Sequence, residues 1–272
     1  MVSFLTDRPP GRNELFARAR DWLLRTLARV PSLQIYRSVF RHDYRDSIRH
    51  QALQVTSNVF LHLHPVTIPR HALKIHFTFC LGGLTLFLFL VETLTGLLLM
   101  FYYRPVPDYA YLDMKTLAFA VRFGPVLRNL HRWGAHVMVI FVMLHMLRVF
   151  LTGSYRPPRE FNWVVGVWLL VLTLLLSFTG YLLPWDQLAF WAVTVGTNMA
   201  AATPFIGSEG PFHILPAQSD VRFLLLGDMK VGGSALLRFY VMHCVAFPLL
   251  AALLMMVHFW RVRKDGGISR PL

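Results

Sequence analysis

Residues 131–150 read HRWGAHVMVIFVMLHMLRVF, and this stretch decides the fold class of the chain. Its only formal charges are Arg132 and Arg148, which lie near its two ends. A helix of about 20 apolar residues is long enough to cross roughly 30 Å of hydrocarbon. The stretch is therefore predicted to be a membrane-spanning helix, and it carries histidines where a lipid-embedded helix would normally have none.

Three further runs have the same character. Residues 75–103 contain Glu92 as their only formal charge, and residues 161–185 and 239–260 contain none. The whole chain of 272 residues is 55% hydrophobic and 15% charged, which is unlike an ordinary soluble domain. We predict an all-α membrane protein, a four-transmembrane-helix bundle with spans at about 75–103, 129–152, 162–184 and 236–261.

The net charge of +13 is distributed unevenly around these spans. Twelve Lys and Arg residues precede the first span, and the second loop and the tail are also basic, whereas the first and third loops hold few. Four spans place both termini and the second loop on one side of the membrane. The pattern is therefore a positive-inside bias that predicts topology, with both termini on the cytoplasmic side, and it indicates no nucleic-acid partner.

The chain is expected to divide into a basic extramembrane N-terminal arm, residues 1–74, and a helical domain, residues 75–272. Residues 1–20 lack the apolar segment of a cleavable signal. Residues 13–30 place Phe16, Leu23 and Leu27 on one helical face, which predicts an amphipathic surface helix or, equally, a helix packed on a partner subunit. The long, half-apolar loop between the third and fourth spans predicts interfacial helices.

Four histidines lie inside the apolar spans in matched positions. His131 and His145 are fourteen residues apart in the second span, and His243 and His258 are fifteen apart in the fourth. Such intervals return each histidine to within about 60° of its partner's face and separate the two by about 21–22 Å along the axis. Because the two spans run in the same direction, they predict two bis-histidine sites at two depths.

Bis-imidazole ligation is typical of low-spin haem iron, and ionisable groups inside a membrane usually mark function. The alternative is that each histidine only hydrogen-bonds a neighbouring helix, as in a transporter or scaffold, which leaves the matched spacing unexplained. His136 lies about 140° round the helix from His131 and is interpreted as structural.

Glycines repeat the same interval, with Gly82 and Gly96 in the first span and Gly166 and Gly180 in the third. A missing Cβ allows a flat macrocycle to approach the backbone, although small residues also serve ordinary helix packing. Cations near the span ends are expected to pair with haem propionates or to anchor the helices at the interface. They are Arg128, Arg132, Arg148, Arg238, Arg263 and Lys264.

Several segments resemble the N-terminal half of the cytochrome b family. They are HRW at 131–133, HMLRVFLTG at 145–153, RPPRE at 156–160, GYLLPWDQ at 180–187 and GIS at 267–269. The fifteen-residue interval in the fourth span resembles cytochrome b6 rather than the cytochrome b of bc1 complexes. The resemblance covers about residues 70–272 and implies two haem b groups. It implies ligation by His131 with His243 near the positive side of the membrane, and by His145 with His258 near the negative side.

The segment FCLGG at 79–83 resembles the part of cytochrome b6 whose cysteine holds a third haem by one thioether. Cys80 lies at the start of the first span, on the same side as His145 and His258, so a covalent c-type haem is expected there. The alternative is an inert packing residue, which is our interpretation of Cys244. The chain has no Cys-x-x-Cys-His motif.

The resemblance implies an electron-transfer subunit of a quinol-oxidising Rieske/cytochrome b complex, which is an enzyme only within that complex. It would carry electrons between quinone sites on the two sides of an energy-transducing membrane. Implied partners are a Rieske iron–sulfur protein, a subunit IV-like C-terminal half of cytochrome b, a c-type cytochrome subunit, quinone and membrane lipid, in a dimeric complex. The alternative is a dihaem anchor of a dehydrogenase or hydrogenase, which does not account for the PWDQ segment at 184–187.

The chain also departs from the family pattern. Its N-terminal arm and its third loop are longer, and one extra residue stands near Asp265. The Pro-Glu-Trp-Tyr motif of the family's quinol site is absent. Glu92 is left between two roles, a proton relay and a neutral, hydrogen-bonded packing residue.

Overall fold

The computed structural model of the protein describes residues 12–29, 70 and 74–265. The chain divides into two units, Met1–Thr67 and Ile68–Leu272, each of which is described by itself. In the first unit, helix α1 spans Arg12–Arg29, close to the helix predicted at 13–30. Large apolar side chains on α1, including Trp22 and Leu27, are exposed. Apart from Arg70 and Lys74, the rest of the predicted arm lies outside the described residues.

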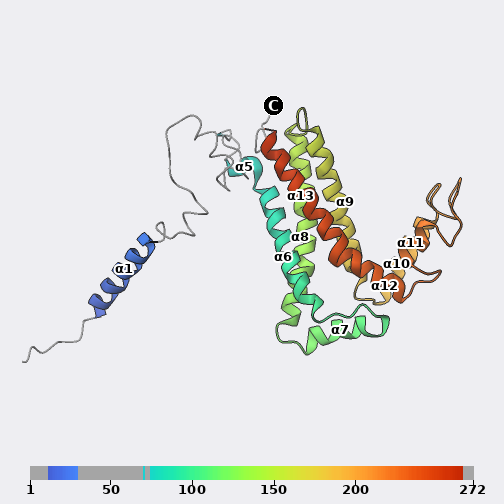
Figure 1. Ribbon diagram of the computed structural model, residues 1–272, viewed down its shortest axis with the longest axis horizontal. Coiled ribbons are helices and arrows are strands. Elements are labelled where there is room, and N and C mark those ends of the chain that lie inside the picture. The colour runs from blue at the N-terminus through green and yellow to red at the C-terminus, as the bar shows by residue number, and fades with distance from the viewer. Residues whose placement is uncertain (1–11, 30–69, 71–73, 266–272) are drawn as a thin grey trace, which may run out of the picture. The chain divides into compact units, whose positions relative to one another are not determined.

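The second unit is all-helical over residues 74–265, without a strand. Its helices, coloured along the chain in Figure 1, are α5 (Ile75–Thr78), α6 (Leu81–Met100), α7 (Pro107–Phe119), α8 (Gly124–Leu151), α9 (Glu160–Leu182), α10 (Gln187–Ala201), α11 (Val221–Leu226), α12 (Gly233–Val241), the π-helical turn η3 (Met242–Ala246) and α13 (Phe247–Lys264).

Within the described residues, four helices are long and apolar enough to cross a membrane. They are α6, α8, α9 and the continuous helix Gly233–Lys264 that α12, η3 and α13 form together. The four predicted spans and the all-α fold class are confirmed. The first span is shorter than predicted, because Phe79 and Cys80 adopt left-handed backbone conformations (φ 49° and 51°) that separate α5 from α6.

The four long helices run side by side in two close pairs (Figure 1). α6 packs chiefly on α8, and α13 packs chiefly on α9. Contacts between α8 and α9 connect the two pairs. α8 and α13, which carry candidate histidines, make few backbone contacts with each other. Large apolar side chains such as Phe87, Leu94 and Leu249 are exposed on the outside, as expected for helices that face lipid.

Short helices close one end of this bundle. α7, which was not predicted, begins at Pro107, a residue whose fixed φ and missing N–H suit the first helical position. The Arg104 guanidinium lies 2.6 Å from Oδ1 of the buried Asp113, and the Arg104 backbone N–H donates to Oδ2 at 2.9 Å. These hydrogen bonds from Arg104 hold the pKa of Asp113 below its ordinary value.

The loop between the third and fourth spans contains α10 and α11, so the prediction that this loop forms short helices is confirmed. Asp186 and Asp220 cap them, each accepting a backbone N–H at 2.8 Å from the residue three positions on. Apolar side chains from these helices join the ends of α9 and α12 in a small core of Leu182, Val193, Leu226, Ala235 and Phe239. This core fixes the direction in which α12 enters the bundle.

Candidate functional site

The structure brings the four predicted histidines together in the two predicted pairs. The rings of His131 on α8 and His243 in η3 have their centroids 6.1 Å apart and are nearly perpendicular, at 83°. The rings of His145 on α8 and His258 on α13 are 6.4 Å apart, at 77°. Each pair therefore joins α8 to the fourth span across the gap between these helices.

Both separations fit one metal atom between two imidazoles. With a metal–imidazole bond of about 2 Å and a ring centroid about 1 Å behind its nitrogen, two axial rings lie roughly 6 Å apart. No cluster of three or more His, Cys, Asp or Glu residues that could hold a metal occurs in the described part of the chain. Two protein ligands per metal suit a haem, in which the planar macrocycle fills the other four positions.

The four predicted glycines lie against these imidazoles. The pairs are Gly82 with His145, Gly96 with His131, Gly166 with His258 and Gly180 with His243. A Cβ added at Gly82 or Gly96 would lie 3.3 Å from the imidazole Cε1, and one added at Gly166 would lie 3.8 Å from it. At Gly180 the distance would be only 2.6 Å. The glycines make room for the histidine rings of the neighbouring helix, while their contact with a macrocycle stays a prediction.

The fifteen-residue interval in the fourth span has a structural explanation. The turn at Met242–Ala246 is π-helical, and such a turn takes one residue more than an α-helical turn. The rotation about the helix axis over the fifteen residues from His243 to His258 is therefore close to the rotation over fourteen residues of the regular helix α8. The π-turn keeps both histidines of the fourth span facing α8.

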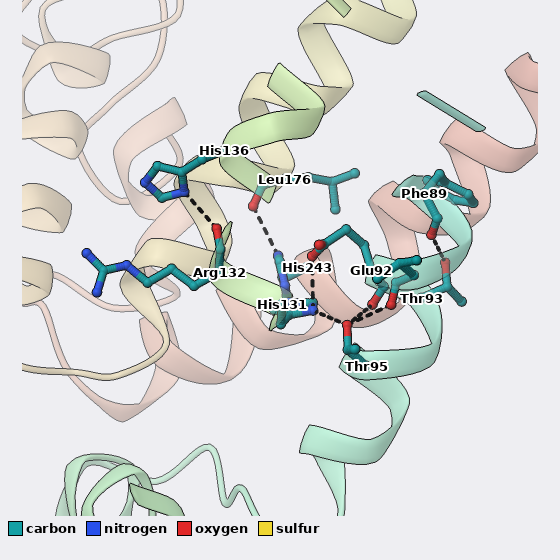
Figure 2. A network of polar contacts seen from close by, with 10 residues as sticks. Phe89, Glu92, Thr93, Thr95, His131, Arg132, His136, Leu176 and His243 are labelled. Carbon is teal, nitrogen blue, oxygen red and sulfur yellow. Dashed lines mark hydrogen bonds and ion pairs between the residues drawn. The ribbon is translucent and has the colours of Figure 1, made fainter. Parts of the chain in front are cut away.

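The outer nitrogen of His131 is held by two oxygens of α6 (Figure 2). Its Nδ1 lies 2.9 Å from Oγ1 of Thr95 and 3.0 Å from Oε2 of Glu92. The Thr95 hydroxyl donates its proton to the Val91 carbonyl at 2.7 Å, so its oxygen is left to accept from His131. Nδ1 must then carry the proton, which leaves the lone pair on Nε2 for a metal.

His243 is held in the same tautomer. Its Nδ1 lies 3.1 Å from the Leu176 carbonyl oxygen and 3.3 Å from Oγ1 of Thr179, both on α9. A carbonyl oxygen only accepts, so Nδ1 donates and Nε2 is again the nitrogen free for a metal (Figure 2). Both candidate ligands at this end of the bundle are thus oriented by hydrogen bonds.

The His145 end is built differently. Nδ1 of His145 and Nδ1 of His258 are buried without a hydrogen bond to any described residue, although the backbone of Asn162 lies near the His258 ring. This end instead gathers polar and charged groups. Arg261 lies 3.0 Å from Oδ1 of Asp265, and the Arg159 guanidinium donates to the Asp265 carbonyl at 3.1 Å.

The predicted propionate partners are spread over the molecule. Arg132 is exposed and points away from His131 (Figure 2), and its carbonyl oxygen lies 2.7 Å from Nδ1 of His136, which fits a structural role for that histidine. Arg238 donates to the Leu224 carbonyl of the third loop, and the Lys264 ammonium lies over the Trp260 ring. The remaining three, Arg128, Arg148 and Arg263, are partly buried. Propionate pairing stays a prediction for all six.

Cys80 lies at the His145 end, two residues before the glycine that packs on His145. Its side chain is exposed, and its left-handed backbone is unusual for a residue with a Cβ. A largely apolar groove of about 730 Å³ lies beside it, lined among others by Phe79, Leu81, Leu84 and Arg148. Cavities of this size commonly hold cofactors or small ligands. Cys244 is half-buried inside η3.

Nearly all of the second unit matches a known protein family. The family described as Cytochrome b/b6/petB matches residues 69–266. The chain belongs to this family. Cytochrome b6 of Heliomicrobium gestii and cytochrome b6 of Heliobacterium mobile are each 44% identical over 209 residues, which are 77% of this chain and 91% of each relative. The predicted resemblance to cytochrome b6 is thus confirmed.

A solved structure shares the fold. A chain of a "Hyperthermophilic respiratory Complex III" superposes with a TM-score of 0.62 at 25% identity and covers 81% of this chain. The match covers 54% of that chain, so this chain spans about half of its length. Membership of the cytochrome b family implies haem b as the cofactor. With its four apolar helices, the chain is an integral membrane protein of electron transport.

Sequence reasoning missed the two threonines that orient His131 and His243. Threonines in apolar helices usually bond only to their own backbone, so neither was singled out. A signal was present nevertheless. Thr95 directly precedes Gly96, and Thr179 directly precedes Gly180, whereas Gly82 and Gly166 follow apolar residues. A Thr-Gly pair on each of two helices marks the end where the ligands are hydrogen-bonded.

Proposed function

We propose that this chain is the electron-transfer subunit of a quinol-oxidising Rieske/cytochrome b complex, with one haem b between His131 and His243 and another between His145 and His258. The single observation that carries the proposal is the facing of these rings at 6.1 and 6.4 Å. A haem b held between two imidazoles supplies a one-electron carrier that changes oxidation state with little ligand rearrangement.

The chain's own residues hold the two sites apart and keep water out. Fourteen residues of α8 separate His131 from His145, which is about 21 Å along the helix. Met138 and Val142 lie between them and are buried, so the stretch of α8 between the sites is apolar on its inner face. A low-dielectric interval between two fixed carriers gives electrons a route across the membrane rather than to solvent.

Assembly into a larger complex is proposed on the basis of the relatives. The expected partners are a Rieske iron–sulfur protein, a c-type cytochrome subunit and a chain that supplies the C-terminal half of cytochrome b. The chain spans about half the length of the Complex III chain that it matches. Quinol and quinone are the proposed substrates, and a dimeric complex is expected from the family.

The orientation rests on charge. Lys and Arg residues are more frequent in the sequence before the first span, in the α8–α9 loop and after the fourth span than in the other two loops, which supports both termini on the cytoplasmic, negative side. The His145–His258 site is then near the negative side and the His131–His243 site near the positive side.

We also propose a third, covalently attached haem at Cys80. Three features support it, namely the exposure of the thiol, its position at the His145 end and the apolar groove beside it, which also contains Arg148. The residue holds an unfavourable left-handed conformation, which costs about 1–3 kcal/mol and is commonly retained at functional sites. Cys244 is not proposed as a second attachment point.

Haem content before and after extraction with acidified acetone tests both parts of the proposal. We expect two extractable b haems and one retained haem, with the polypeptide mass increased by one haem. Cys80→Ala should lose only the retained haem, and Cys244→Ala, the matched control, should lose none. An unmodified mass would remove the covalent haem from the account, and a purified chain without haem absorbance would contradict the whole proposal.

A further inference from the structure

We propose that Glu92 is a positioning residue for the haem between His131 and His243, and that its carboxyl group lowers the reduction potential of this haem by accepting the Nδ1–H of His131. The inference rests on the proposed function, because it presumes a haem at this pair. It assigns a task to the one formal charge inside the first span.

The geometry places Glu92 where it can act only on this histidine. Its Oε2 lies 3.0 Å from Nδ1 of His131, while its Oε1 is buried and has no other hydrogen-bond partner among the described residues. Its side chain is 14% exposed and that of His131 is 22% exposed, so the contact is shielded from water. The carboxyl group is therefore aimed at the outer nitrogen of a proposed iron ligand (Figure 2).

The backbone of α8 is shaped to admit this carboxyl group. Gly134 lies one turn beyond His131, and a Cβ at this position would lie 2.0 Å from Oε1 of Glu92, far inside contact distance. Any other residue at 134 would push the carboxyl group away. The absence of a side chain at Gly134 therefore leaves the space that the Glu92 carboxyl group occupies.

An acceptor on Nδ1 makes the opposite nitrogen of the ring a stronger donor to a metal. A more basic ligand stabilises the oxidised iron relative to the reduced iron, so the reduction potential falls. A carboxyl oxygen accepts in either protonation state, so the direction of the effect is the same for both, and its size is larger for the ionised group. Thr95 shares the same proton at 2.9 Å and helps to fix the plane of the ring.

The test is an optical redox titration of the full chain purified with its haems. In Glu92→Leu, the midpoint of one haem should rise by an amount equivalent to about a tenfold change in its oxidised-to-reduced ratio, or about 59 mV for one electron. Glu92→Gln, which keeps an acceptor oxygen, should give a smaller rise. The low-spin EPR signal of the same haem should shift, because the His131 ring loses one of its two hydrogen bonds and is held by Thr95 alone.

Gly134→Ala provides an independent route to the same result. It leaves Glu92 in the chain but displaces its carboxyl group, so the same haem should shift in the same direction. Thr93→Val is the matched control, because Thr93 is a neighbour of Glu92 whose hydroxyl bonds only to the Phe89 carbonyl, at 2.8 Å. It should move neither midpoint.

His131→Leu identifies the haem concerned, since it should remove the titration component that the Glu92 variants shift. If Glu92→Leu, Glu92→Gln and Gly134→Ala keep both haems with unchanged midpoints, the inference is overturned while the proposed function stands. Equal shifts of both haems would also overturn it. If His131→Leu leaves both haems in place, the proposed ligation itself fails, and the inference fails with it.

Discussion

The two histidine pairs have nearly the same ring separation but are held in different ways. His131 and His243 each donate Nδ1–H to oxygens of the neighbouring helix, whereas Nδ1 of His145 makes no such hydrogen bond within the described residues and the His258 ring has only the Asn162 backbone near it. At the first pair orientation comes from hydrogen bonds, and at the second it comes from packing against Gly82 and against α9. One bundle thus contains two chemically distinct sites.

This difference predicts a direction for electron flow. Acceptors on the outer nitrogens lower the potential at the His131 end, and the partly buried cation Arg148, one turn beyond His145, favours reduction at the other end. We expect the haem at the His131 end to have the lower potential. Transfer of an electron from the His131 end to the His145 end is then favourable, because it goes from the lower to the higher reduction potential.

The largest expected effect concerns the helical spacing that separates the two ends. Deleting Val245 from the π-turn should leave a regular helix with fourteen residues between His243 and His258, as on α8, so both b haems should be retained. Deleting Ile140, an exposed residue of α8, should rotate His145 by about 100° relative to His131, because α8 has no extra residue to give up. Haem stoichiometry of the purified chains measures both results. Loss of a haem on deletion of Val245 would contradict this explanation of the fifteen-residue interval.

The next effect compares glycines at the two ends. Gly180→Ala introduces a Cβ 2.6 Å from the His243 ring. Because changes that turn a metal ligand away from its orientation commonly weaken binding at least tenfold, haem retention at the His131 end should fall about tenfold. Gly166→Ala, the matched control, places its Cβ at 3.8 Å from the His258 ring and should be tolerated. Haem loss under dilution or mild detergent stress measures the difference, and equal loss in both variants would refute it.

Much of this account could be predicted from the sequence. The apolar runs predicted the four spans, and the intervals of fourteen and fifteen residues predicted which histidine rings face each other, because the 3.6-residue period of a helix determines which residues share a face. The tail beyond Asp265, where part of the resemblance lies, is outside the described residues.

Other features could not be predicted, for physical reasons. The π-turn was hidden, because a fifteen-residue interval also fits a regular helix with an offset. Helix α7 was missed, since its residues form no clear periodic apolar face and its buried Asp113 is paired with Arg104, a residue outside the helix. The choice between two roles for Glu92 required knowing that α6 packs on α8, because neither role leaves a mark in the local sequence.

A smaller effect distinguishes the two contacts of His243. Thr179→Val removes the weaker one, at 3.3 Å, and leaves the Leu176 carbonyl in place. Because a hydrogen bond contributes about 1 kcal/mol, the oxidised-to-reduced ratio of this haem should change by no more than about fivefold, towards reduction. Thr173→Val, a buried α9 threonine that bonds the Leu169 carbonyl, is the control and should leave both midpoints unchanged. A larger shift at the His145 end than at the His131 end would be inconsistent with the comparison.

The smallest effect concerns the helix that closes the His131 end. Asp113→Asn should lower the thermal stability of the purified chain, because the Arg104 hydrogen bonds are weakened. The ordinary pKa of an aspartate is 3.8 and that of folded Asp113 is lower, so its stabilisation is complete above about pH 5 and fades as the pH falls through the folded value. Melting temperatures of wild type and variant should therefore converge at low pH. Asp108→Asn, an exposed position in the same helix, should change stability less.

The central claim, that each haem is held by one histidine of α8 and one of the fourth span, is tested most directly by haem counts in double variants. Replacing both members of one pair, His131→Leu with His243→Leu, should leave one b haem, the same as either single variant. Replacing one member of each pair, His131→Leu with His258→Leu, should leave none. One b haem remaining in the second double variant, or none in the first, would contradict the pairing on which the account rests.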